Sequence, residues 1–319
     1  MSNNEKIAIL KDFLGGYNRT GQEYLFTCPK CKHHKRKLSV NLDKNVFKCW
    51  ICEFKGNNIN RLVRKYADFN LKAKWRELTG QVEIQQFDEI IATLFPEEEE
   101  DTPEVVKLPN EFLSLANKSK SVLSTKARNY LAKRGITDED ILFWKIGYCP
   151  SGEYAGRIIV PSFSESGDCN YFIGRTYQND WRKYMNPPTS KSKIIFNELY
   201  IDWQEDLVLT EGIFDAIVSG KNSVPILGSS LREQSRLFKS IIRNDTPVYV
   251  ALDPDAEEKA ASLVENLIKY GAEVYKIEVF PYNDVGEMPK KEFQKRKNTA
   301  RLMSSEDAFL QKFISTFDF

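Results

Sequence analysis

Residues 206–220 read DLVLTEGIFDAIVSG, a short apolar run followed at once by an acid, a glycine and a helical pattern. The apolar residues 207–210 predict a buried strand, and residues 213–219 predict a helix. Further strands are expected at 224–227, 248–252 and 274–280, with helices at 231–242 and 256–270. Strands that alternate with helices predict a largely parallel sheet that is covered on both faces.

Acidic residues follow the ends of these strands. Glu211 directly follows the first strand, Asp253 ends the third with Asp255 two residues on, and Asp284 follows the fourth. Since functional groups of such sheets gather beyond the carboxyl ends of the strands, we expect these acids to converge. Neighbouring carboxylates raise one another's pKa unless a cation lies among them. Mg²⁺ or Mn²⁺ suits such oxygen ligands. Asp215, one helical turn after Glu211, either faces the same metal or caps the helix.

Two C-x-x-C pairs separated by seventeen residues lie near the N-terminus, at Cys28, Cys31, Cys49 and Cys52. This spacing is typical of a zinc ribbon, in which two tight turns place four thiolates on one ion. Two disulfides are the alternative, but no signal-peptide pattern precedes the cysteines, and a cytoplasmic location keeps thiols reduced. His33 or His34 could replace one sulfur, and four cysteines remain the preferred ligand set.

Charge is unevenly distributed although the whole chain carries only +1. Residues 1–80 hold 17 Lys and Arg against 7 Asp and Glu, a net charge of +10, whereas residues 81–117 carry −9. The basic residues crowd the cysteine loop and favour contact with phosphates, although a solvated lysine-rich loop over a core containing Phe47 is the alternative. The acidic run 97–101, flanked by prolines, predicts a linker. Beyond it, residues 125–135 and the acidic stretch that follows Thr137 predict two short helices, with Thr137 as the N-cap of the second.

Five further stretches accompany the acidic elements and the cysteines. They are ARNYLAKRGIT at 127–137, GRIIVP at 156–161, FIGR at 172–175, KYMNPP at 183–188 and NDVGEM at 283–288. In this order they resemble the polymerase core of DnaG-type primases, whose carboxylates belong to a Toprim domain shared with topoisomerases and some nucleases. The cysteine array resembles the primase zinc ribbon, and the resemblance covers most of residues 24–295.

The resemblance implies an α+β multidomain chain with an N-terminal β zinc ribbon and a primase core. That core would join a mixed α/β basic subdomain to a Rossmann-like Toprim α/β domain. The expected boundaries are 1–80 for the ribbon, 81–110 for the acidic linker, 111–205 for the basic subdomain, 206–290 for Toprim and 291–319 for a helical tail. The implied activity is metal-dependent synthesis of short RNA primers on single-stranded DNA, as by a primase-type DNA-directed RNA polymerase, a nucleotidyltransferase.

The same resemblance suggests roles for individual residues. Arg157, Arg175, Lys183 and Tyr184 would face the nucleotide and the template, because Arg forks onto phosphate oxygens, Lys supplies a point charge and Tyr stacks. The catalytic set would be Glu211, Asp253, Asp255, Asp215 and Asp284, the first three holding magnesium. One zinc ion would either position the template or stabilise the ribbon. Expected partners are the DNA template, ribonucleoside triphosphates and a separate replicative helicase, without a membrane.

The chain departs from the family pattern at several points. Cys31 stands where many bacterial primases have histidine, which is closer to phage forms and implies the host cytoplasm if the chain is phage-encoded. Val285 replaces a proline, which leaves a ligand role for Glu287 open. The phosphate-loop pattern of a fused helicase motor is absent. About thirty residues follow Met288, too few for the helicase-binding domain of bacterial primases, so we expect any helicase contact to differ.

Other classes share parts of this pattern. A recombination mediator resembling RecR also joins a four-cysteine zinc site to Toprim and binds single-stranded gaps, but it lacks the arginine-bearing strands of residues 156–188. A Toprim nuclease would use the same carboxylates without predicting the ribbon. A topoisomerase needs a catalytic tyrosine domain and a much longer chain.

Overall fold

The computed structural model describes residues 3–52, 54–56, 58–79, 104–227, 231–304, 306–308 and 310. The chain divides into two compact units, Met1–Thr93 and Leu94–Phe319. Each unit has its own sheets and its own buried core, as expected for a chain of this length.

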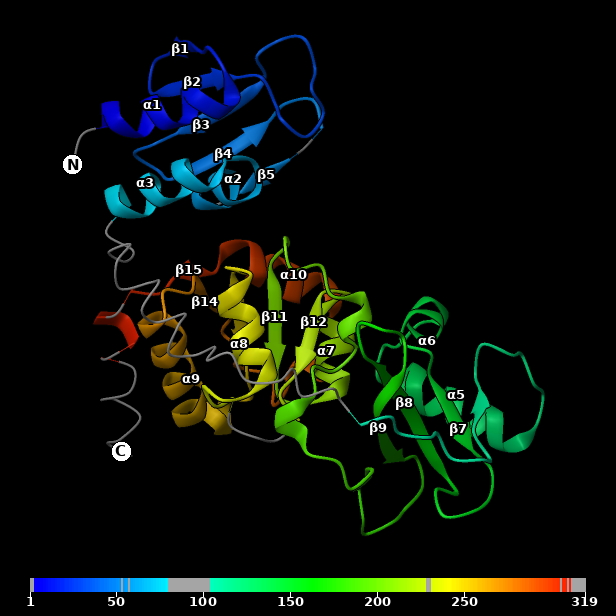
Figure 1. Cartoon of the computed structure of the whole chain (residues 1–319). Helices are drawn as coiled ribbons and strands as arrows, with labels where there is room; N and C mark the ends of the chain where they lie inside the picture. Colours follow the sequence, from blue (N-terminus) through cyan, green and yellow to red (C-terminus); the bar gives the residue numbers. More distant parts are fainter. Residues whose placement is uncertain are drawn as a thin grey trace. The chain divides into compact units, whose positions relative to one another are not determined.

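The first unit is a five-stranded antiparallel sheet whose strands follow one another in sequence order. Its strands are β1 (Asn18–Thr20), β2 (Glu23–Phe26), β3 (Leu38–Asn41), β4 (Val46–Cys49) and β5 (Lys55–Gly56). Its helices are α1 (Asn3–Leu14), α2 (Asn60–Tyr66) and α3 (Phe69–Thr79), visible in Figure 1. Phe26, Leu38 and Phe47 are buried in one core, so the prediction that Phe47 belongs to the core is confirmed.

The acidic run 97–101 and most of the predicted linker 81–110 lie outside the described residues. The described part of that segment packs onto the second unit. Val106 donates its backbone N–H to the Cys169 carbonyl at 2.8 Å, and Val106 and Leu108 pack against buried Phe172. Residues 106–108 are therefore attached to the second unit, which differs from a spacer that runs to residue 110.

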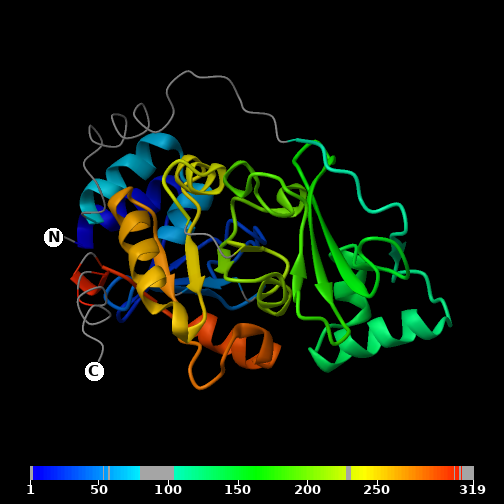
Figure 2. The same cartoon turned by 90° about the horizontal axis from the view of Figure 1, so that it is seen from below.

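A second five-stranded antiparallel sheet occupies the middle of the chain, in the order β10-β9-β8-β7-β6. Its strands are β6 (Leu113–Ser114), β7 (Gly147–Cys149), β8 (Arg157–Phe163), β9 (Cys169–Thr176) and β10 (Tyr184–Met185). Between β6 and β7 the chain forms α5 (Val122–Lys133) and α6 (Asp138–Phe143), the two short helices that the sequence predicts. Helix α5 is the blue-green helix that lies beside this sheet in Figure 2.

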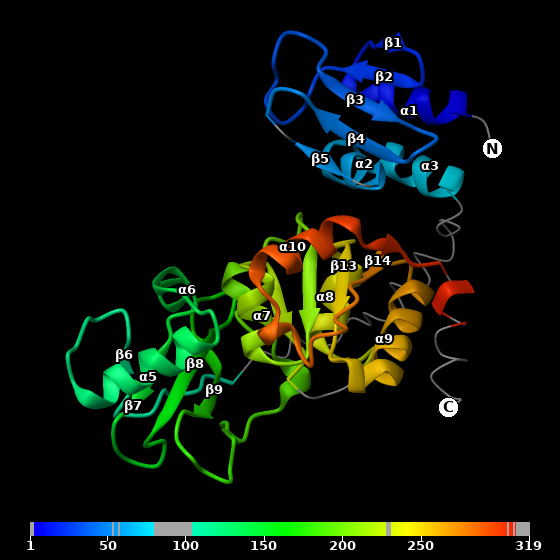
Figure 3. The same cartoon turned by 180° about the vertical axis from the view of Figure 1, so that it is seen from behind.

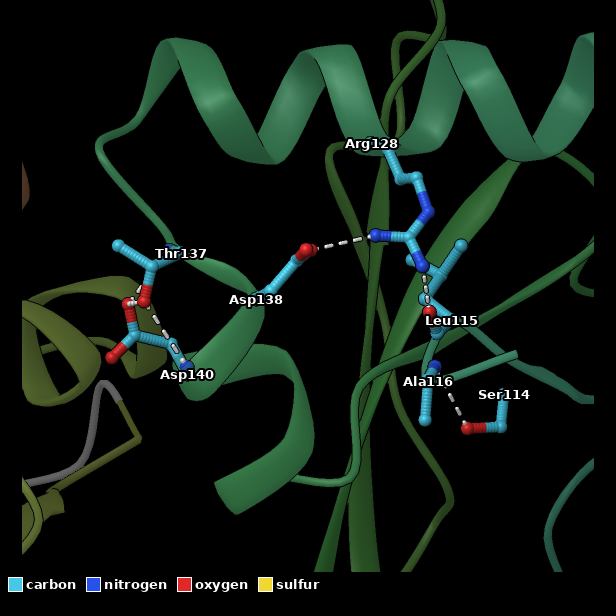
Figure 4. Close-up of polar contacts among 7 residues, drawn as sticks. All are labelled: Ser114, Leu115, Ala116, Arg128, Thr137, Asp138 and Asp140. Carbon is cyan, nitrogen blue, oxygen red and sulfur yellow. Dashed lines mark hydrogen bonds and ion pairs between the residues drawn. The ribbon is translucent and has the colours of Figure 1, made fainter. Parts of the chain in front are cut away.

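Polar contacts fasten these two helices to the sheet (Figure 4). Thr137 caps α6 by accepting the Asp140 N–H, while the Asp140 carboxylate accepts the Thr137 N–H, so the predicted cap is a full capping box. Arg128 reaches from α5 to the Asp138 carboxylate at 2.9 Å and to the Leu115 carbonyl beyond β6. One guanidinium thus joins α5, α6 and the edge of the sheet.

The third sheet confirms the mainly parallel arrangement, with the strand order β12-β11-β13-β14-β15. Its strands are β11 (Leu207–Thr210), β12 (Ser223–Pro225), β13 (Val248–Ala251), β14 (Val274–Lys276) and β15 (Arg301–Leu302). The helices are α7 (Ile213–Ser219), α8 (Arg236–Arg243), α9 (Glu257–Lys269) and α10 (Lys290–Thr299). The first four strands pair in parallel, and β15 adds an antiparallel edge.

Helices cover both faces of the third sheet. Right-handed crossovers place α8 and α9 on one face and α7 on the other, and α10 joins α7 (Figures 1 and 3). Side chains alternate accordingly, because Val208, Tyr249 and Tyr275 share a core with Phe293 of α10. This arrangement leaves the carboxyl ends of β11, β13 and β14 at one edge of the sheet.

Several element boundaries differ from those predicted. Helix α8 begins at Arg236 rather than 231, because the Ser235 hydroxyl caps it by accepting the Phe238 N–H. Strand β14 ends at Lys276, not at residue 280. The expected helical tail from residue 291 is partly integrated into the third sheet through α10 and β15, and residues 311–319 lie outside the described part.

Three ionic or polar contacts join the second and third sheets within the second unit. Lys290 pairs with Asp140 at 2.5 Å and Arg236 with buried Glu198 at 3.0 Å. Lys191 donates to the Leu227 carbonyl at 2.8 Å. These contacts link helices and turns that flank the two sheets.

Leu209 tests the packing of the third sheet, because it is fully buried in β11 between two paired strands. We expect Leu209→Ala to lower the free energy of unfolding by about 2–5 kcal/mol, as measured by chemical denaturation. Leu142→Ala on the exposed side of α6 is the matched control and should change it by less than about 0.5 kcal/mol. Equal effects of the two substitutions would contradict this packing.

Candidate metal centres and their surroundings

The four cysteines of the first unit converge at two turns. Cys28 and Cys31 follow β2, where the Lys32 N–H donates to the Cys28 carbonyl at 2.8 Å and closes the first turn. Cys49 ends β4, and its N–H donates to the Phe54 carbonyl at 2.7 Å around the second turn that contains Cys52. All four sulfurs lie within 4.8 Å of one another, and no histidine belongs to this cluster among the described residues.

The sulfur geometry fits a tetrahedral zinc ion. Cys28 and Cys52 are 3.8 Å apart at sulfur, and Cys31 and Cys49 are 3.9 Å apart. Zn–S bonds of about 2.3 Å in a tetrahedron place sulfurs about 3.8 Å apart. The cysteines are free thiols, so the disulfide alternative does not describe this structure. Burial raises the pKa of the Cys28 thiol to about 12, which a bound cation would offset by stabilising the thiolate.

The surface around this cluster is basic and aromatic. Lys30, Lys32 and Lys35 are exposed on the cysteine loop. On the second turn Trp50 and Ile51 are also exposed, and the Lys48 ammonium lies 4.6 Å from the centre of the Trp50 ring. Exposed cations beside an exposed indole form a surface suited to phosphates and unpaired bases.

A second cluster lies at the carboxyl ends of β11 and β13. Glu211 follows β11, and Asp253 and Asp255 follow β13, and their carboxylate oxygens lie within 4.8 Å of one another. Adjacent parallel pairing of these strands explains the convergence, because it brings Thr210 opposite Ala251 at the end of each strand. The structure therefore brings together the three acids that the sequence predicts as a magnesium site.

The electrostatics of this cluster are those of crowded acids. Burial raises the pKa of Asp253 to about 7, with further contributions from the negative charges of Asp215, Glu211 and Asp284. Glu211 Oε2 and Asp253 Oδ1 are buried and have no hydrogen-bond partner among the described residues. Since buried polar oxygens are normally paired, this donor set fits a hard divalent cation such as Mg²⁺ or Mn²⁺.

Asp215 occupies a different position from these three acids. It is 8% exposed, and its two oxygens accept the Gly212 N–H at 2.9 Å and the Gly286 N–H at 2.8 Å. Burial, followed by the charge of Asp284, raises the pKa of Asp215 to about 6. Of the two roles that the sequence left open, the cap of α7 is the one that the hydrogen bonds show.

Asp284 lies outside the three-acid group and begins the turn η4 (Val285–Glu287), where its carboxylate accepts the Glu287 N–H at 2.7 Å. A side chain at position 286 would place a Cβ 3.0 Å from Asp215 Oδ1 and 3.2 Å from Asp284 Oδ1. Gly286 therefore allows this turn to approach the acids closely. Glu287 is exposed and accepts from Asn283 at 2.9 Å.

Two of the predicted nucleotide-binding residues stack on each other. The Arg175 guanidinium lies 4.6 Å from the centre of the Tyr184 ring, and these residues are register partners of β9 and β10. Arg175 also donates from Nε to the Tyr130 hydroxyl at 3.1 Å. Asp215 and Arg175 both act on the pKa of Tyr184, which burial raises, so this pair borders the acidic edge.

Arg157 does not lie where the sequence suggests. Its side chain is 4% exposed and pairs with Asp180 at 2.7 Å, and it donates to the Arg182 carbonyl at 2.9 Å. The guanidinium therefore fastens the loop between β9 and β10 rather than facing solvent or a phosphate. Lys183 is exposed on this loop, where a point charge remains accessible.

Arg134 is a residue that the motif analysis did not select. It ends α5 and lies 4.8 Å from the centre of the Phe214 ring and 5.2 Å from that of Tyr130. Its charge lowers the pKa of neighbouring Asp215. Arg134 lies within the stretch 127–137, but an arginine at the end of a helix is usually a surface cation. Only the folded structure shows its contact with Phe214.

Comparisons with known proteins agree with this geometry. Residues 4–92 match the family model described as CHC2 zinc finger. The DNA primase of Staphylococcus epidermidis is 23% identical over 312 residues, covering 82% of this chain and 52% of that protein. The DNA primase of Thermotoga maritima is 24% identical over 325 residues, covering 86% and 55%. This chain is similar to DnaG-type DNA primases.

Solved structures share the fold of this chain. The catalytic domain of DnaG primase bound to single-stranded DNA matches with a TM-score of 0.52 and 18% identity, covering 73% of this chain and 85% of that one. The E. coli primase catalytic core matches with a TM-score of 0.51 and 19% identity, covering 62% and 80%. The predicted fold class, a zinc ribbon followed by a mixed α/β primase core, is therefore confirmed. The chain spans about half the length of the curated relatives that it matches.

The raised pKa of Asp253 predicts how stability depends on pH in the metal-free protein. Folded Asp253 binds its proton up to about pH 7, whereas an ordinary aspartate releases it near 3.8. The folded state thus holds more protons between these values, so the free energy of unfolding should fall as pH rises from about 4 to about 7 and then level off. Denaturant titrations across this range, without added magnesium, measure the fall.

Asp253→Asn should make that fall smaller, because the amide does not ionise. Glu258→Gln, on an exposed position of α9, is the control and should keep the wild-type pH profile. A full wild-type fall in Asp253→Asn would show that Asp253 does not carry the perturbed proton.

The four-sulfur cluster predicts the effect of removing one thiol. Cys49→Ser should leave the purified chain with substoichiometric zinc and lower the unfolding temperature of the first unit, because metal binding stabilises such small sites. Cys169→Ser, in the second unit, is the control and should retain one zinc per chain. Elemental analysis by mass spectrometry checks both, and full zinc retention in Cys49→Ser would refute the ligand assignment.

Proposed function

We propose that this chain synthesises short RNA primers on a single-stranded DNA template by metal-dependent nucleotidyl transfer. The observation that carries the proposal is the Glu211, Asp253 and Asp255 cluster, with two buried unpaired oxygens, at the carboxyl edge of the parallel sheet. Its support is the similarity to DNA primases, together with a fold like that of DnaG catalytic cores.

Glu211, Asp253 and Asp255 would hold Mg²⁺ or Mn²⁺. When bound, such an ion lowers the pKa of an attacking 3′-hydroxyl and offsets the negative charge of the departing pyrophosphate. Glu211 is the best placed general base, since it is the acid directly after β11 and keeps one oxygen free of hydrogen bonds. Asp215 and Asp284 act as positioning residues, because their carboxylates accept hydrogen bonds from backbone N–H groups. The donors belong to the turns that carry the acids.

Cationic and aromatic groups beside the acids would position the nucleotide and the template. Arg175 is stacked on Tyr184, so its guanidinium plane is already oriented for phosphate oxygens. Lys183 is exposed and adds a mobile point charge. Arg134, stacked on Phe214 beside Asp215, supplies a third cation that would offset charge near the acidic edge.

The zinc-binding unit would hold the template through its exposed lysines and Trp50. The competing role is that zinc only stabilises the small fold. Primer initiation distinguishes the two, because a variant that lacks zinc yet retains folded first-unit structure should initiate poorly only if the unit contacts the template.

Several partners of the proposed activity remain predictions. Ribonucleoside triphosphates are the expected substrates, and a separate helicase is the expected partner. A location in the cytoplasm, or in a host cytoplasm if the chain is phage-encoded, is likewise a prediction. Among the helices that the structure describes, none has the length and apolar character that crossing a bilayer requires.

The alternative functions receive less support. A RecR-like mediator is not favoured by the comparisons, which match DNA primases. The arginine-bearing strands β8 and β9 also form the middle sheet, which is the feature that a mediator is expected to lack. A Toprim nuclease would cleave the template instead of extending a primer, so the product of the reaction separates it from a primase.

Glu211→Gln tests the proposed site directly. Incubating the chain with single-stranded DNA, the four ribonucleotides and Mg²⁺ should yield short oligoribonucleotides, resolved by electrophoresis. Glu211→Gln should reduce this synthesis by at least about 100-fold while leaving DNA binding intact, because it removes a metal ligand and proposed general base but no contact to the DNA. Glu258→Gln is the control and should remain fully active.

Retained synthesis in Glu211→Gln would refute the assigned site. Cleavage of the DNA without any oligoribonucleotide product would identify a nuclease, and DNA binding with neither product would favour a mediator.

A further inference from the structure

Trp181 is the most exposed large hydrophobic side chain in the described part of the chain, with 86% of its surface accessible. It lies in the loop between β9 and β10, next to Arg182, whose guanidinium is 5.1 Å from the ring centre. An indole left in water costs free energy that contact with another flat apolar surface would recover. The sequence motifs did not assign any role to this residue.

The loop that presents Trp181 is built as a fixed support. Buried Arg157 pairs with Asp180 at 2.7 Å and donates to the Arg182 carbonyl at 2.9 Å, so it contacts the residues on both sides of Trp181. Asp180 also accepts the Arg182 N–H at 2.9 Å. These three contacts tie the backbone and the acid of the loop to one buried guanidinium, which restricts the conformations open to residues 180–182.

The same loop lies beside the acidic edge. Trp181 is three residues before Tyr184, so their Cα atoms are at most about 11 Å apart. Tyr184 contacts Arg175 and experiences the charge of Asp215. That span corresponds to roughly three stacked base steps of about 3.4 Å. A strand that contacts Tyr184 would therefore reach the exposed indole within a few nucleotides.

The charges around the indole favour a polyanion. Arg182 and Lys183 are exposed on the loop, and the neighbouring strand carries Arg175. The one acid of the loop tip, Asp180, is already paired with Arg157.

We propose that Trp181, backed by Arg182, is a stacking platform for an unpaired base of the nucleic-acid strand that runs past Arg175 and Lys183 towards the acids. This inference rests on the proposed function, because it takes the strand to be the template. Base stacking on aromatic side chains is sequence-tolerant, so the platform holds the strand in place without reading its sequence. Arg157 is then a positioning residue for template contact through the loop.

The test uses the whole zinc-loaded chain and a fluorescein-labelled oligothymidylate, with affinity measured by anisotropy in the absence of nucleotides. Trp181→Ala should weaken binding by roughly tenfold, and Trp181→Phe should recover most of the affinity, because a ring is retained. Val122→Ala, which truncates another exposed apolar side chain at the start of α5, is the matched control and should bind as the wild type does.

Salt dependence separates stacking from charge. Trp181→Ala should keep the wild-type slope of log affinity against log salt, whereas Arg182→Ala should reduce it by up to about 0.7, the value for one phosphate of a single strand. An oligomer carrying iodouracil should crosslink under light to the peptide that contains Trp181. Free ATP with Mg²⁺ should bind Trp181→Ala and wild type equally, which assigns the stacked base to the strand rather than to the incoming nucleotide.

The failures of the two proposals are distinguishable. Wild-type affinity in Trp181→Ala, together with no crosslink at its peptide, overturns the platform while primer synthesis still stands or falls by Glu211→Gln. Equal losses in Trp181→Ala and Trp181→Phe also overturn it, because a retained ring would then have no effect. A wild-type chain that binds no oligothymidylate would overturn the platform, whereas the proposed primer synthesis is judged separately by its oligoribonucleotide products.

Discussion

The Asp215 carboxylate is the contact on which the acidic edge of the third sheet depends. Its two oxygens accept N–H groups from Gly212, directly after Glu211, and from Gly286, in the turn that begins at Asp284. Residues more than seventy positions apart are thus joined by one buried side chain. Because the carboxylate also caps α7, the first acid, the helix and the last turn form one assembly.

Raised pKa values explain how this edge tolerates several acids. Asp215 and Asp253 both have raised pKa values, about 6 and about 7, so part of the negative charge is neutralised by protons when no cation is present. Backbone N–H groups stabilise the ionised form of Asp215, whereas Asp253 keeps an unpaired buried oxygen. The site therefore contains one acid satisfied by protein and others left for a ligand.

Much of this arrangement could be predicted from sequence because it follows local rules. An apolar run that ends in Glu211, a repeat of strand and helix, and two C-x-x-C pairs each specify geometry within a few residues. The Thr137 cap was equally readable, and its capping box confirms it. Arg157 could not be placed in this way, because an arginine in a motif is usually interpreted as a phosphate ligand. Its pairing with Asp180 depends on the fold of the loop between β9 and β10. Arg134 and the double role of Asp215 likewise depend on segments distant in sequence.

The glycine at position 286 has a consequence for how quickly a cation could be captured. Since the backbone N–H of Gly286 already bonds to Asp215, the turn that begins at Asp284 is joined to the start of α7 before an ion arrives. Little conformational entropy remains to be lost at that moment. The rate of ion uptake would then be limited by the loss of water from the hydrated ion, and not by movement of the polypeptide.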